Sequence, residues 1–186
     1  MTLKSIRSTA FVASVATVLL AASVHAQKTT TMGTGDGGSV HVKTEWVIAP
    51  AHIAITYGRP TLKSRSEAEM MPAGQPWRTG ADVATIITTD QTLKFGDITL
   101  APGSYSINTE PGEASWKFIA GKLDTPNQWG VPYQPKLEIG RAPMKLGKAL
   151  KPVEMLTISI DPTTKGGTLR VEWGTKSATI PFTVLP

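Results

Sequence analysis

The chain has 186 residues, a formal net charge of +5 at pH 7 and no cysteine. The absence of cysteine excludes disulfides, thiolate metal sites and thiol catalysis, so stability must come from packing and hydrogen bonds. The length that remains after an N-terminal targeting segment fits one domain around one core. Basic residues are spread along the sequence rather than gathered on one periodic face, which is typical of solubility and predicts no nucleic-acid partner.

The first 26 residues have the pattern of a cleaved secretory signal peptide. Lys4 and Arg7 precede an apolar run over residues 10–22, and Val24 and Ala26 place small side chains at the cleavage positions. The run is shorter than the roughly 20 residues of a spanning helix, and no later segment approaches that length. We therefore expect an exported protein, periplasmic or secreted, with no transmembrane span after cleavage.

Residues 27–39 are mostly threonine, glycine and other small polar types, too poor in apolar groups to offset the entropy of ordering. They predict a flexible leader, with a single β domain over residues 40–186.

Alternating apolar and polar residues predict a strand over residues 40–48 and a second over 53–57, where Tyr57 lies on the same face as Ile55. Further strands with short turns are expected at 83–89, 92–95, 98–100, 104–108 and 115–119. The stretch from 121 to 152 carries several Pro and Gly residues and predicts a long irregular loop with one brief strand, 136–139. Ordered loops of such length tend to be functional.

Three more alternating segments close the chain, at 154–160, 169–173 and 178–182. Turns are expected between them at 162–167 and 174–176, and Pro181 indicates an edge or a bulge because proline lacks an N–H. Many short strands without 3.6-residue periodicity favour an all-β fold, a single antiparallel β-sandwich or partly closed barrel with one long irregular loop.

Several motifs resemble the bacterial exported family catalogued as domain of unknown function 2911. They are the segments 55–60 (ITYGRP), 77–81 (WRTGA), 100–106 (LAPGSYS), 128–130 (QWG), 154–158 (EMLTI) and 171–174 (VEWG). The resemblance covers nearly all of the chain after the signal peptide. The sequence departs from the family's usual pattern at Asp82 and Val83 and over residues 63–71. The family name assigns no function, so the resemblance implies an exported single domain and brings no activity.

Five motif residues are candidates for ligand binding: Tyr57, Arg59, Trp77, Arg78 and Trp129. Arginine is a planar fork of five donors that suits carboxylates and phosphates, and loop aromatics beside such forks are typical of clefts for sugars or small molecules. The alternative is structural, with Arg59 and Arg78 bonding loop carbonyls and the two tryptophans covering the ends of the sandwich. Trp46, Trp116 and Trp173 fall on strand faces and predict core residues.

Evidence for an enzyme is weaker. His41 and His52 are too few and too isolated to predict a metal site, and no serine stands in a nucleophile motif, so no metal or other cofactor is expected. Asp82, next to the Trp-Arg segment, is the one candidate acid or base, and its alternative is a turn cap or the ion-pair partner of Arg78.

Three hypotheses follow. The first is a binding module for a small anionic or sugar-like ligand, which includes glycans. The second is a hydrolase of an envelope polymer, with Asp82 as acid or base supported by Arg78. The third is a structural or interaction domain without a small ligand, whose protein partner the sequence does not identify.

Overall fold

The computed structural model describes residues 27–185, so the predicted signal peptide lies outside the described residues. The described part is a single antiparallel sheet of ten strands in the order β1-β2-β3-β4-β7-β8-β9-β10-β5-β6, which confirms the all-β prediction. No helix in this part is long and apolar enough to cross a bilayer. The elements are β1 (Gln27–Thr34), β2 (Val40–Ile48), β3 (Ala51–Arg59), α1 (Glu67–Met70), β4 (Thr85–Thr89), β5 (Thr92–Phe95), β6 (Ile98–Leu100), β7 (Gly103–Glu110), β8 (Ser115–Gly121), the 3-10 turn η1 (Pro135–Leu137), β9 (Glu138–Thr163) and β10 (Gly166–Leu185).

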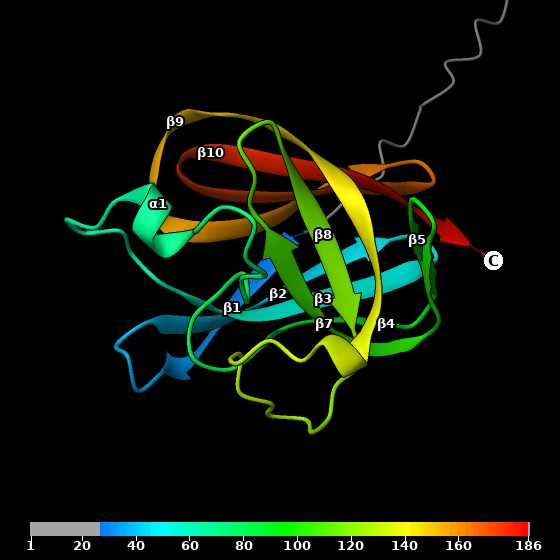
Figure 1. Cartoon of the computed structure of the whole chain (residues 1–186). Coiled ribbons are helices and arrows are strands. Elements are labelled where there is room, and N and C mark those ends of the chain that lie inside the picture. Colours follow the sequence, from blue (N-terminus) through cyan, green and yellow to red (C-terminus); the bar gives the residue numbers. More distant parts are fainter. Residues whose placement is uncertain (1–26, 186) are drawn as a thin grey trace, which may run out of the picture.

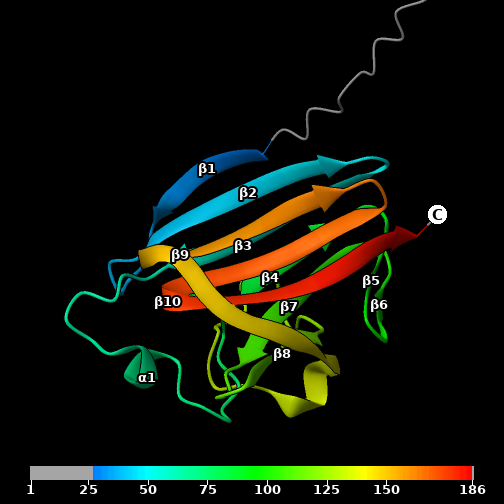
Figure 2. The same ribbon diagram turned by 90° about the horizontal axis from the view of Figure 1, so that it is seen from above.

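The sheet folds back on itself without closing into a barrel (Figures 1 and 2). The chain that leaves β3 meets the second half of β9: the N–H of Leu156 donates to the carbonyl of Pro60 at 2.9 Å, and a bridge joins Thr61 to Met155. Strands β1 and β6 remain as the two edges. The result is the sandwich-like, partly closed arrangement that the strand pattern predicts.

The folded sheet encloses one apolar core. Trp46, Trp116 and Trp173 are buried there, as their strand positions predict. Phe95 stacks on Phe118 with ring centroids 4.7 Å apart, which ties β5 to β8. Full burial of one large apolar side chain contributes about 1.5–3 kcal/mol, so a core of this size stabilises the domain without disulfides.

The structure differs from the predicted flexible leader, because residues 27–34 form strand β1. This strand pairs with β2 along its whole length, with Gln27 opposite Trp46 and Thr34 opposite Val40. All eight of its residues are exposed, so backbone pairing holds it, together with one side-chain hydrogen bond between the hydroxyls of Thr29 and Thr44 at 3.1 Å. Met32 is the one large apolar residue of this segment, and a strand held by backbone pairing needs no alternating apolar pattern that the sequence could reveal. The described sheet therefore includes residues 27–34, upstream of the predicted boundary at residue 40.

Two long strands replace several of the short ones that the sequence predicts. Residues 138–152, expected in the irregular loop, belong to the 26-residue β9, and the true loop is limited to residues 122–134. The turn expected at 174–176 is a bulge inside the 20-residue β10, with Gly174 at φ +60°. Pro181 lies between the last residue of β10 that pairs with β9 and the first that pairs with β5, where no ladder N–H is required.

Candidate functional site

The segment 77–82, which links α1 to β4, is held in an unusual conformation. Trp77 and Thr109 exchange both backbone hydrogen bonds, at 2.7 and 2.9 Å, and the buried hydroxyl of Thr85 donates to the carbonyl of Thr79 at 2.9 Å. Thr79 and Asp82 have φ values of 52° and 62°, in the left-handed region that residues with a Cβ rarely adopt. Such backbone positions are costly and gather at functional sites, so this segment is the first place to look for one.

Trp77 is half-buried, and its ring packs within the fold. It stacks on Trp173 with centroids 5.5 Å apart and an interplanar angle of 10°, and meets the edge of Trp116 at 6.4 Å. One face of the indole is therefore already covered. Trp77 therefore anchors the start of segment 77–82 in the core, and this face of its ring is not available to stack on a ligand.

Arg78 is half-buried and has few partners. Its Nε donates to the carbonyl of Gly80 at 3.2 Å, while its two terminal nitrogens have no hydrogen bond to any described residue. The stem of the side chain lies against Gly130, where a Cβ would stand 2.5 Å from the Cδ of Arg78. Burial lowers the pKa of Arg78, and the nearby carboxylate of Asp82 opposes that effect without pairing with it. Arg78 is thus a partly desolvated cation whose terminal nitrogens carry four N–H donors that no residue of the range 27–185 accepts.

Asp82 pairs with a histidine rather than with Arg78. Its Oδ2 lies 2.8 Å from Nε2 of His41 on β2, and its backbone carbonyl accepts from the N–H of Gly130 at 3.0 Å. Asp82 is only 7% exposed. A Cβ at Gly35 would stand 2.0 Å from Oδ2, so a residue without a side chain is required where the β1–β2 connection passes over this pair.

Arg78 and Asp82 line the same open pocket of about 460 Å³. Its other polar side chains include Arg65, which is exposed, and Ser39. Its walls are otherwise largely apolar or glycine: Gly37, Pro60, Met70, Pro72, Pro76, Trp77, Gly80, Ala81 and Val131. The volume falls within the range of small-molecule sites, which combine a mostly apolar lining with a few polar groups.

Tyr57 and Arg59 serve the fold at a different place, where β3 meets β9. The hydroxyl of buried Tyr57 accepts from the N–H of Ile158 at 3.0 Å, and burial raises the pKa of this phenol. Arg59 donates from Nε to the carbonyl of Leu156 and from a terminal nitrogen to the hydroxyl of Thr157, both at 2.9 Å. Neither residue lines the pocket that holds Arg78.

Trp129 is 48% exposed on the 122–134 loop and forms a bridge with Val83, but it does not line the pocket either. Of the five candidate ligand residues, the structure brings Trp77 and Arg78 to one pocket, together with Asp82. The sequence did not identify His41 and Arg65 as members of this region. His41 lies 41 positions from Asp82, and no spacing in the sequence signals that pairing.

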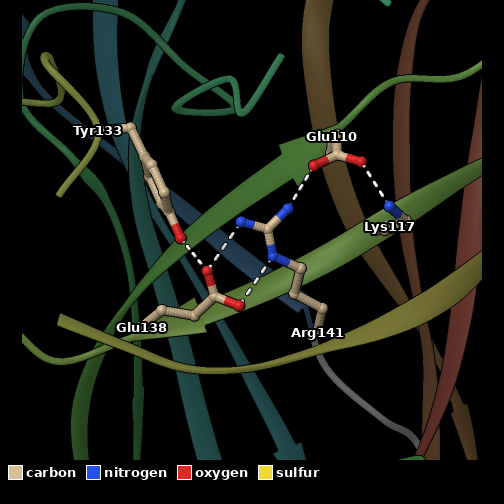
Figure 3. A network of polar contacts seen from close by, with 5 residues as sticks. All are labelled: Glu110, Lys117, Tyr133, Glu138 and Arg141. Atoms are coloured by element: carbon tan, nitrogen blue, oxygen red, sulfur yellow. Dashed lines mark hydrogen bonds and ion pairs between the residues drawn. The ribbon is translucent and has the colours of Figure 1, made fainter. Parts of the chain in front are cut away.

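A second polar region lies on the face of β7, β8 and β9 and was also missed. Figure 3 shows the guanidinium of Arg141 between the carboxylates of Glu138 and Glu110, with Lys117 on the far side of Glu110. Arg141 reaches both oxygens of Glu138, at 2.8 and 2.9 Å, and the hydroxyl of Tyr133 donates to Glu138. Arg141 holds the pKa of Glu138 below its ordinary value, whereas burial and then Glu138 raise the pKa of Tyr133 to about 12.

This network attaches the 122–134 loop to the sheet. Beneath the loop lies a small cavity of about 20 Å³, lined by Ser106, Asn108, Gln128 and Tyr133 among others. That volume holds one water molecule, and the polar lining offers it partners. The region therefore has the features of a structural junction rather than of a ligand pocket. Among residues 27–185, no group of three or more potential ligand side chains is arranged to hold a metal ion.

Comparison with known proteins gives one match. The model of the family described as "Protein of unknown function (DUF2911)" matches residues 39–182. No curated protein and no solved structure matches the chain.

Proposed function

The chain belongs to the DUF2911 family, whose description assigns no function, and we propose from the pocket that it is a binding module for a small anionic ligand anchored by Arg78. The proposal rests on the burial and the missing hydrogen-bond partners of the Arg78 guanidinium. It is partly desolvated, and among residues 27–185 it has no carboxylate partner and no hydrogen bond from its terminal nitrogens, which lie at a pocket of about 460 Å³. Partly buried charges are normally paired, so an anionic ligand would supply the missing partner.

The sugar-like alternative has less support, because the ring of Trp77 is stacked on Trp173 and Trp129 lies away from the lining. An anion with an apolar body suits the proline and methionine walls better. The rim residue Arg65 adds a second positive charge that attracts anions to the opening.

A thermal-shift screen tests the proposal. Carboxylates, phosphates and neutral sugars are added to the native protein, to Arg78→Gln and to Lys148→Gln, a control that removes the same charge from an exposed position. A ligand at about 100 times its Kd stabilises the folded state by roughly 2.7 kcal/mol. We expect an anion to raise the Tm of the native protein and of Lys148→Gln, and not that of Arg78→Gln. An equal shift in all three proteins, or none with any anion, would contradict an anion site at Arg78.

The hydrolase remains the second candidate because of the His41–Asp82 hydrogen bond at 2.8 Å. A histidine held by a carboxylate can take a proton from water and return it to a leaving group. The test is turnover of envelope-polymer fragments by the native protein and by Asp82→Asn. Turnover that survives this substitution with little change removes Asp82 from the mechanism.

We also propose export to the periplasm or the medium, on the strength of the signal-peptide pattern in residues 1–26. N-terminal sequencing of the protein recovered from outside the cytoplasm should begin at Gln27. A sequence that begins at residue 1 or 2 contradicts cleavage.

A further inference from the structure

We propose that the ligand is a small carboxylic acid with a hydrogen-bond donor, an ammonium or a hydroxyl group, beside its carboxylate, as in α-amino and α-hydroxy acids. The inference rests on the proposed function, because it takes Arg78 as the partner of the carboxylate. It adds a second contact, in which the donor of the ligand binds to Asp82.

The free oxygen of Asp82 is the first observation. Its Oδ2 is bonded to His41, whereas Oδ1 has no hydrogen bond to any described residue, although Asp82 is 7% exposed. Among the described residues, the one fully enclosed side-chain nitrogen or oxygen without a partner is Nε1 of Trp46, so Oδ1 of Asp82 remains in contact with the pocket. A carboxylate oxygen accepts at least one more hydrogen bond, which water can supply in the open pocket and which a donor of the ligand can replace.

This acceptor is held in place before any ligand arrives. His41 fixes one oxygen, the N–H of Gly130 fixes the backbone carbonyl, and the chain passes close by at Gly37, where a Cβ would stand 3.1 Å from Oδ1. Preorganised groups lose little freedom on binding, which increases affinity for a ligand of matching geometry.

The opposite charges of Arg78 and Asp82, which form no ion pair with each other, determine which ligand fits the pocket. They attract each other, yet no ion pair joins them within 4.0 Å, so each keeps unsatisfied groups at the same pocket. A plain anion bound to Arg78 would meet repulsion from the Asp82 carboxylate. A ligand with a donor beside its carboxylate satisfies Arg78 and Asp82 together: an ammonium group cancels that repulsion by its charge, and a hydroxyl group offsets it with a hydrogen bond. The apolar walls at Met70, Pro72 and Val131 leave room for a side chain.

Titration calorimetry with probes of one carbon skeleton tests the inference. The probes are leucine, its α-hydroxy analogue leucic acid, the plain acid isocaproate, and isoamylamine. We expect leucine or leucic acid to bind about tenfold tighter than isocaproate, which is the size expected of one charge-assisted hydrogen bond. The amine alone should not bind measurably. The series glycine, glycolate, acetate and methylamine repeats the comparison without a side chain that the pocket could exclude.

The variant Asp82→Asn isolates the second contact, with Asp97→Asn, an exposed position, as control. Asparagine tolerates the left-handed φ of this position, so the backbone is retained. The preference for leucine or leucic acid over isocaproate should fall severalfold in Asp82→Asn and stay unchanged in the control. If isocaproate binds as tightly as both others and depends on Arg78, the donor contact is overturned while the anion-binding function stands. If no carboxylate of either series binds, the donor contact at Asp82 and the binding of carboxylates at Arg78 are both overturned.

Discussion

Arg59 and Arg78 have the same chemistry and different partners, and the partners decide what each residue does. Arg59 donates to Leu156 and Thr157 across the junction of β3 and β9, whereas the side chain of Arg78 makes one hydrogen bond within the described part of the chain, to Gly80. Hydrogen bonds from charged donors contribute about 1.5–3 kcal/mol each. A structural role was one of two alternatives that the sequence left open for both arginines, and the contacts favour it for Arg59.

Removal of the two arginines should therefore have opposite effects on stability and binding. We expect Arg59→Gln to lower the free energy of unfolding by about 2 kcal/mol, because it leaves Leu156 without its donor. Arg78→Gln should lower it by less than about 1 kcal/mol, since a partly desolvated charge is removed together with one hydrogen bond. Urea denaturation of both variants gives the two values, and a larger loss in Arg78→Gln would assign it to the fold.

Gly130 offers a way to displace Arg78 without changing its charge. In Gly130→Ala the new Cβ would lie 2.5 Å from Cδ of Arg78 and 3.0 Å from the carbonyl of Asp82, so the arginine must move. Affinity for the anion found in the screen should fall at least about tenfold. Gly147→Ala, where the nearest atom is 3.7 Å away, serves as the control. Unchanged binding in Gly130→Ala would mean that the position of Arg78 is not what the ligand recognises.

At the level of elements, alternation predicts where strands occur but not where they end. Gly174 joins the two alternating segments of β10. In the sequence this glycine predicts a turn, whereas in the fold its left-handed φ belongs to a bulge inside one continuous strand. Glu67 explains the difference: it accepts hydrogen bonds from the N–H and hydroxyl of Thr175, so a residue of α1 fills the space beside the bulge. A contact across more than 100 residues has no local signal.

The Tyr133–Glu138–Arg141–Glu110 network predicts how acid affects the loop. Lys117 and Arg141 lower the pKa of Glu110, and Arg141 lowers that of Glu138, so their stabilising effect is complete above the ordinary carboxyl value of 4.5. It is lost as the pH falls through the lowered values. Arg141→Gln should cost about 1 kcal/mol at pH 7, the upper end for exposed ion pairs.

Unfolding of the native protein and of Arg141→Gln should therefore be compared at several pH values. The difference between their unfolding free energies should stay constant from pH 7 to about pH 5 and shrink below that. A difference that persists at low pH would show that Arg141 acts through packing or through its cation–π contact with the ring of Tyr133 at 5.9 Å, and not through its ion pairs with the two glutamates.

At the level of the whole molecule, the fold class can be predicted from the sequence, but the set of residues that meet at the pocket cannot. Alternation and the absence of helical periodicity are properties of single segments, so an all-β domain could be predicted. The pocket instead requires the folded sheet to bring His41 of β2, the 77–82 segment and the 122–134 loop together. Arg78 and Asp82 are close in the sequence and line one pocket, whereas only the fold separates them from Tyr57 and Arg59.

The central claim is that Arg78 receives the anion, and NMR of the arginine guanidinium nitrogens during a ligand titration tests it most directly. With the anion from the thermal-shift screen, the Arg78 resonances should shift and saturate with the same midpoint as binding measured by calorimetry, and those of Arg59 should stay in place. Saturable binding that leaves the Arg78 resonances unchanged, or that moves those of Arg59 instead, would contradict this account.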